Sequence, residues 1–135
     1  MASGGMVVLH FGDYGLCGVF AMPDPARVCV VSNGTGYSVN VDEPVKTSEL
    51  RALPIRDVRI VSDARILLLA DFTSLFALGS DGELWTHRVC LDDLKISSIE
   101  QGIVSGTGYD PTNSEHISRF AVQLATGRIL QSAWS

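Results

Sequence analysis

Apolar and polar residues alternate along most of this chain, and short glycine-containing turns interrupt the alternation. The period of two is clear in residues 37–41, 85–89 and 120–124. Successive side chains of a β-strand point to opposite faces, so this pattern predicts strands with one buried face. Glycine and asparagine supply the positive φ that tight hairpin turns need. Such turn signals stand at Ser32-Asn33-Gly34, Ser80-Asp81-Gly82, Gln101-Gly102 and Thr126-Gly127.

The alternation and the turns together predict the order of the strands. Residues 66–70 are apolar throughout, which is typical of a central strand covered on both faces. A short helix is expected over 45–52, with Pro44 in its first turn and Pro54 beyond its end. Residues 109–116 are rich in turn formers and predict a long exposed loop. The predicted strands are 16–21, 27–32, 36–41, 57–62, 65–71, 74–79, 83–89, 94–99, 102–108, 117–123 and 128–132.

We expect one all-β domain over residues 1–135, with 1–12 as a flexible leader. A chain of 135 residues with 46% hydrophobic residues can bury one core. The antiparallel hairpins would form a sandwich, a barrel or a partial-propeller-like sheet, with at most one short helix.

The charge balance argues against two classes of partner. The formal net charge is −5, whereas nucleic-acid binding depends on basic residues that neutralise phosphates. Anionic membrane surfaces are disfavoured for the same reason, and no apolar run is long enough to span a bilayer. The three cysteines, Cys17, Cys29 and Cys90, show no disulfide or zinc spacing, so we expect a reduced, cytoplasmic protein.

Three segments share the order strand, glycine turn, strand: residues 28–41, 75–89 and 120–134. In the second, Phe76-Ala-Leu78 is followed by a glycine turn and Glu83-Leu-Trp85, which resembles the outer hairpin of quinoprotein-type propeller blades. That resemblance implies blade-like sheets. Three copies are fewer than the four to eight blades that close a ring, so either an open sheet pairs with itself or the hairpins stack into a sandwich.

A broader resemblance covers residues 57–131. It rests on Ala70-Asp-Phe72, Gly82-Glu-Leu-Trp85, Asp92-Asp-Leu-Lys95, Gly106-Thr-Gly-Tyr-Asp110 and Phe120-Ala-Val-Gln-Leu-Ala-Thr-Gly127. These residues are similar to a family of small uncharacterised bacterial proteins. The resemblance implies a fold and no activity, and it assigns no functional residue.

No cofactor and no metal site is predicted. The histidines His10, His87 and His116 lie far apart in the sequence, without the i, i+2 or i, i+4 spacing of a ligand pair. The glycines of residues 102–108 lack both the strand-to-helix context of a dinucleotide fingerprint and the lysine of a phosphate-binding loop.

Asp71 is the acidic residue most in need of an explanation. It follows a buried apolar strand, where a carboxylate is costly unless it is paired or hydrogen-bonded. It either caps the following turn, which is the commoner role for aspartate, or it is a functional acid. The candidate binding surface comprises Asp71, Trp85, His87, Arg88, Asp93, Lys95, Tyr109 and Asp110.

Specific expectations follow for one ion pair and for three aromatic residues. Lys95 and Asp93 share one face and would form an exposed ion pair. Trp85, Tyr109 and Trp134 either pack in the core, which is commoner for strand aromatics, or form a stacking surface.

Two functions are compatible with the sequence. The first is a non-catalytic binding or interaction module, because no nucleophile and base are recognisable and the edges of an open sheet need to be covered. It would associate with itself as a homodimer or larger oligomer, with another protein or a small polar ligand as further partners. The second is a small hydrolase that uses Asp71 or Asp110 with His87 or His116 as acid and base.

Overall fold

The computed structural model of the chain describes residues 6–12 and 15–132, with side chains from residue 16 onward. Within this part, the only helical segment is the three-residue 3-10 helix Ser62–Ala64, and no described helix is long and apolar enough to cross a membrane. The remaining regular elements are the strands β1 Met6–Gly12, β2 Gly15–Ala21, β3 Arg27–Ser32, β4 Thr35–Asn40, β5 Thr47–Glu49, β6 Asp57–Val61, β7 Ile66–Ala70, β8 Ser74–Gly79, β9 Gly82–Arg88, β10 Lys95–Glu100, β11 Ile103–Tyr109, β12 Ile117–Gln123 and β13 Ile129–Gln131.

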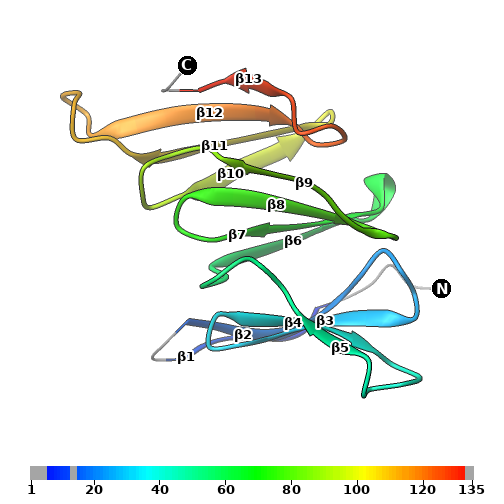
Figure 1. Cartoon of the computed structure of the whole chain (residues 1–135). Helices are drawn as coiled ribbons and strands as arrows, with labels where there is room; N and C mark the ends of the chain where they lie inside the picture. Colours follow the sequence, from blue (N-terminus) through cyan, green and yellow to red (C-terminus); the bar gives the residue numbers. More distant parts are fainter. Residues whose placement is uncertain (1–5, 13–14, 133–135) are drawn as a thin grey trace.

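The strands form three antiparallel sheets, each made of consecutive strands: β1 to β5, β6 to β9 and β10 to β13. Figure 1 shows these sheets stacked face to face, with the second sheet between the other two. The prediction of an all-β fold of antiparallel hairpins is confirmed. The sheets stack as open layers and do not close into a barrel.

The second sheet is covered on both faces, as residues 66–70 predicted. All five residues of β7 are buried. Leu67 and Leu69 belong to the apolar cluster between the first and second sheets, whereas Leu68 and Ala70 belong to the cluster between the second and third. Alternate residues of β7 therefore pack into two different cores, so both faces of this strand must be apolar.

The repeated hairpin noticed in the sequence has a structural counterpart. Its three copies correspond to β3 and β4, β8 and β9, and β12 and β13, which are the third and fourth strands of each sheet. Each sheet is therefore a simple up-and-down meander, and the meanders stack as propeller blades do.

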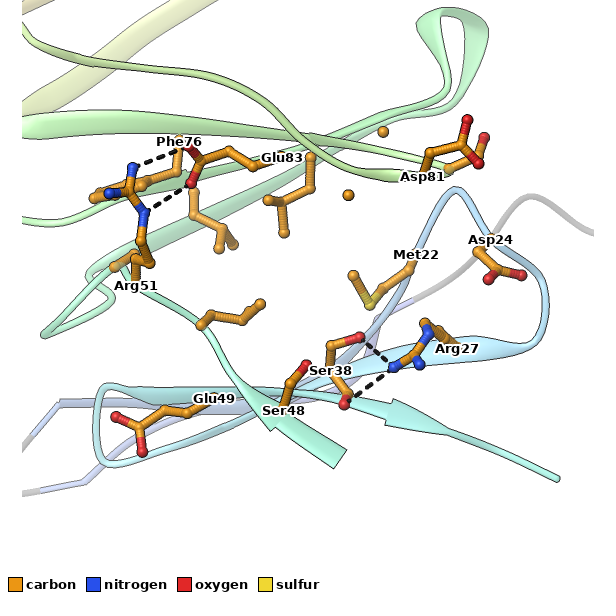
Figure 2. A pocket seen from close by; sticks show the side chains of 17 residues that line it. Met22, Asp24, Arg27, Ser38, Ser48, Glu49, Arg51, Phe76, Asp81 and Glu83 are labelled. Atoms are coloured by element: carbon orange, nitrogen blue, oxygen red, sulfur yellow. Dashed lines mark hydrogen bonds and ion pairs between the residues drawn. The ribbon is translucent and has the colours of Figure 1, made fainter. Parts of the chain in front are cut away.

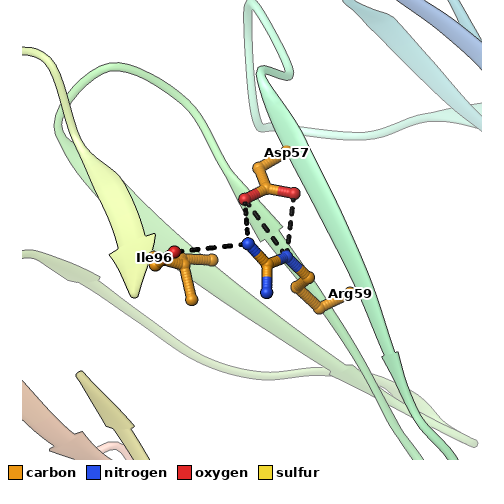
Figure 3. A network of polar contacts seen from close by, with 3 residues as sticks. All are labelled: Asp57, Arg59 and Ile96. Carbon is orange, nitrogen blue, oxygen red and sulfur yellow. Dashed lines mark hydrogen bonds and ion pairs between the residues drawn. The ribbon is translucent and has the colours of Figure 1, made fainter. Parts of the chain in front are cut away.

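The second and third sheets are also joined by a polar contact (Figure 3). Arg59 on β6 binds the carboxylate of Asp57 through Nε and Nη2, with its Nη2–Oδ2 distance 3.1 Å. The same Nη2 donates to the backbone oxygen of Ile96 on β10 at 3.3 Å. This arginine connects sheets that share no backbone pairing.

Two expectations differ from the structure. The helix expected over 45–52 is wrong, because Thr47–Glu49 forms β5 and pairs with β4. A segment this short gains little from helix propensity, and pairing with a ready-made sheet edge outweighs it. Of the leader expected over 1–12, Met6–Gly12 is instead a strand paired with β2, and residues 1–5 lie outside the described part. The exposed loop between β11 and β12 is confirmed.

Candidate functional site

Trp85 is a core residue. Its side chain is buried, and its indole Nε1 donates to the backbone oxygen of Leu124 at 2.7 Å. The half-buried ring of His87 stacks on it, with 5.6 Å between ring centroids. Trp85 therefore fixes β9 against the third sheet, and it is unavailable as an exposed stacking platform. Trp134 lies outside the described residues.

Asp71 takes the turn-capping role. Its Oδ1 accepts hydrogen bonds from the backbone N–H groups of Thr73 and Ser74, at 2.9 and 2.8 Å. These bonds satisfy the carboxylate at the end of β7 and shape the turn into β8.

Arg88, Asp93 and Lys95 lie on the surface around the connection from β9 to β10. Nζ of Lys95 lies 3.5 Å from Oδ2 of Asp93, so the expected ion pair is confirmed. Both side chains are more than 60% exposed, which limits the pair to about 0–1 kcal/mol. Arg88 donates from Nε to the backbone oxygen of Cys90 at 3.3 Å.

Tyr109 and Asp110 begin the exposed loop after β11. The Tyr109 ring is 44% exposed and stacks on His116, with centroids 6.2 Å apart. Asp110 accepts from the Thr112 hydroxyl and backbone N–H, at 2.6 and 2.8 Å. These hydrogen bonds lower the pKa of Asp110, and the charge of His116 acts in the same direction. The arrangement organises a surface loop.

The acid–base pairs that a hydrolase would need are not brought together in a cleft. Asp71 is engaged by Thr73 and Ser74, and His87 stacks on Trp85. Asp110 and His116 share an open loop. Among the described side chains, no histidine lies within 4.0 Å of a carboxylate oxygen.

A cleft of about 570 Å³ lies elsewhere, between the first and second sheets (Figure 2). It exists because the inward side chains of β3 and β4 change from apolar at one end to polar at the other. At one end Val31 of β3 and Ile55 of the connection after β5 fill the space against the second sheet. At the other end the inward positions hold Arg27 and Ser38, which leave the sheets apart. We call this space the inter-sheet cleft.

The inter-sheet cleft has one polar wall and one apolar wall. On the first sheet, Nη1 of Arg27 donates to Oγ and the backbone oxygen of Ser38, at 3.0 and 3.4 Å. Ser48 on β5 pairs with Ser38 and points the same way. The opposite wall is made of Leu69, Phe76 and Leu78 of the second sheet, all in the apolar cluster.

An ion pair between Arg51 and Glu83, with a further hydrogen bond to Thr86, closes one side of the inter-sheet cleft; we call this group the clasp. Arg51, in the connection after β5, donates from Nε and Nη2 to the two carboxylate oxygens of Glu83, at 3.0 and 2.9 Å, and from Nη2 to Thr86 Oγ1. A bulge in β9 brings Glu83 and Thr86 to one face, because they lie opposite Leu78 and Phe76 on β8. The clasp ties the first sheet's connection to the second sheet.

None of the eight residues of the predicted binding surface lines the inter-sheet cleft. Sequence reasoning missed the inter-sheet cleft, because a gap between two sheets depends on which face each strand turns inward. The signal that could have pointed to it is Arg27, a charged residue at the start of the apolar run Val28-Cys-Val-Val31. Within the described part of the chain, no group of three or more histidine, cysteine, aspartate or glutamate side chains could hold a metal ion.

No known protein family matches the sequence, and no curated protein matches it significantly.

Proposed function

We propose that the chain is a non-catalytic interaction module that pairs with a second copy of itself through the outer face of its first sheet. The observation that supports this proposal is a set of apolar side chains on that face. The set, here called the outer valine face, consists of Val19, Ala21, Val28, Val30, Tyr37 and Val39.

The outer valine face is continuous across three strands. Val19 pairs with Val30, and Val30 pairs with Tyr37. In the next row Val28 pairs with both Ala21 and Val39. These side chains alternate with the inward ones, and none belongs to either apolar cluster of the chain. Contiguous apolar patches of this kind mark interaction sites.

The opposite end of the stack differs. The outward positions of β11 and β12 in the third sheet are mixed: Ser105, Thr107, Arg119 and Gln123 stand among Ile103, Tyr109, Ile117 and Ala121. The paired Thr107 and Arg119 interrupt the apolar residues of that face. A continuous apolar face supports the first sheet as the end that a second copy covers, at one end of the stack in Figure 1.

The outer valine face can accept a second copy because it is almost free of charge. Each copy carries a net charge of −5, and contact through an uncharged face avoids placing like charges against each other. Along the two rows of the outer valine face, the one charged residue among the described positions is Glu49, at the β5 end beside Tyr37. A two-fold dimer places the same patch on both partners, which an uncharged face allows.

The size of the face indicates a weak dimer. Three strands spaced by about 4.8 Å, with about six residues rising about 3.3 Å each, give a flat area of roughly 300 Å² per copy. This is the size of a weak or transient interface, so we expect dissociation in the micromolar range. We expect the protein to act in a reducing compartment such as the cytoplasm, a proposal supported by its three free thiols.

The proposal is tested by multi-angle light scattering and sedimentation equilibrium across a concentration series. The wild type should shift from monomer to dimer, and Val30→Glu should remain monomeric because it brings two carboxylates together at the centre of the interface. Thr107→Glu, on the outward face of the third sheet, is the matched control and should dimerise like the wild type. A wild type that stays monomeric up to about 100 μM contradicts the proposal, since the expected dimer is micromolar.

A further inference from the structure

We infer that the inter-sheet cleft binds a small zwitterion that carries an apolar group, of the class of aromatic or branched α-amino acids and their dipeptides. This site is separate from the outer valine face, so the inference does not depend on self-association. Three features of the cleft match the three parts of such a ligand.

The apolar wall would receive the side chain of the ligand. Leu69, Phe76 and Leu78 form one side of the cleft, and Met22 lies on the other (Figure 2). A flexible methionine adapts to ligands of different shape, and an aromatic ring packs well against leucine and phenylalanine. The volume of about 570 Å³ lies within the range of small-molecule pockets, with room for a dipeptide.

Arg27 would bind the carboxylate of the ligand. The guanidinium is anchored through Nη1 to Ser38, and among the described side chains no carboxylate oxygen lies within 4.0 Å of it. Guanidinium groups recognise carboxylates through paired N–H donors, and here Ser38 fixes the orientation in advance. The Ser48 hydroxyl, on the same wall, adds a donor.

Asp24 and Asp81 would bind the ammonium group. They come from different sheets and lie at the mouth of the cleft, where Figure 2 shows both carboxylates. Oδ1 of Asp24 accepts from the Ala26 backbone N–H, and neither aspartate forms an ion pair within the described part of the chain. An ammonium held between them would be attracted by both.

The other charged residues of the cleft do not alter this assignment. Arg51 and Glu83 are paired with each other. Glu49 points away from the cleft in Figure 2, since it shares the outer face with Tyr37. One cation, Arg27, and two anions, Asp24 and Asp81, thus remain without an ion pair among the described residues at the cleft.

The experiment is a titration with L-phenylalanine and L-phenylalanyl-L-leucine, followed by isothermal calorimetry and by the amide shifts of residues 79–83 and of Met22, Asp24, Ala26 and Arg27. At least one of these ligands should saturate the wild type. For that ligand, the C-terminal amide and the N-acetyl form should each bind about tenfold or more weakly, as expected for loss of one charged hydrogen-bonded pair. Glycine should bind at least as weakly, because it lacks the apolar group.

Variants distinguish binding in the inter-sheet cleft from binding elsewhere on the protein. Arg27→Met and the double variant Asp24→Asn/Asp81→Asn should each weaken binding about tenfold or more. The matched controls Arg128→Met and Asp42→Asn/Asp63→Asn, on exposed positions outside the cleft, should bind as the wild type does. Circular dichroism checks that each variant is folded, and the isosteric aspartate variant keeps the test valid if Arg27→Met unfolds.

Two results would overturn the inference. The first is that neither ligand shows saturable binding to the wild type at concentrations up to about 10 mM. A dissociation constant above that concentration would be too weak for a specific site. The second is equal affinity for the amide and N-acetyl forms, which would show that neither charge of the ligand is recognised.

Discussion

The ring of Trp85 occupies the space that a side chain at Gly127 would need. A Cβ built on Gly127 would lie 2.6 Å from Cγ of Trp85, closer than real contacts allow. Gly127 also has a φ of +76°, a conformation that favours glycine. Trp85 also donates a hydrogen bond to the backbone oxygen of Leu124 in the same turn. The packing and the hydrogen bond together join the second sheet to the third at this point.

Gly127→Ala should therefore destabilise the protein more than a turn glycine usually does. Gly102→Ala is the matched control, because Gly102 has the same φ of +76° and no atom within 4 Å of its added Cβ. We expect Gly102→Ala to cost about 1–2 kcal/mol for the left-handed backbone. Gly127→Ala should cost roughly 1–3 kcal/mol more, because it also overpacks against Trp85. Urea unfolding measures both, and equal losses would contradict the contact.

Leu68→Ala should remove about 2–5 kcal/mol of stability, because the side chain is fully buried between the second and third sheets. Leu84→Ala, on β9 of the same sheet, is the control. Leu84 is 52% exposed, so the same chemical change should cost far less. Chemical unfolding compares the two, and similar losses would mean that this core is not formed.

The Arg51–Glu83 clasp should contribute little to stability despite its good geometry. The side chains are 66% and 35% exposed, and solvent screens such a pair. A double-mutant cycle with Arg51→Met and Glu83→Gln should give a coupling free energy of about 1 kcal/mol or less. A coupling above about 2 kcal/mol would show that the clasp is desolvated in solution.

The buried thiols should resist alkylation. Burial raises the pKa of Cys29 to about 12 and that of Cys90 to about 11. At pH 8 the Cys90 thiol is three pH units below its pKa, so only about one molecule in a thousand carries the reactive thiolate. Iodoacetamide followed by mass spectrometry should label half-exposed Cys17 first in the native protein.

The same raised pKa values predict a loss of stability at alkaline pH. The unfolded chain releases these thiol protons near pH 9, whereas the folded protein retains them to about pH 11 or 12. Stability from these groups is thus complete below pH 9 and falls as the pH rises through that range. Urea unfolding from pH 8 to 11 should show a smaller decline in Cys29→Ala than in the wild type.

Local patterns were enough to predict most of the fold. Asn33 and Gly34 form a hairpin turn with φ of 49° and 84°, and this follows from their chemistry alone. The segment Ile66–Ala70 predicted a doubly covered strand because no other environment suits five apolar residues between turns. The expected cap at Asp71 and ion pair at Lys95 likewise involve neighbours in sequence.

The candidate site could not be predicted in this way. Ser38 is buried because Arg27, eleven residues earlier, reaches it across the sheet. Asp24 and Asp81 line the same cleft because the turn after β2 and the turn after β8 lie on one side of two stacked sheets. The helix expected over 45–52 was wrong for the same reason, since β5 depends on β4 being present.

By itself, the sequence determined most of the strands, the turns between them and the strand that is covered twice, because these depend on side-chain alternation and on the backbone freedom of a few residues. The tertiary structure alone decided which faces meet. The distance between stacked sheets is set by the side chains of both, so a gap beside Arg27 and an uncovered apolar face on the first sheet arise only when the layers are assembled.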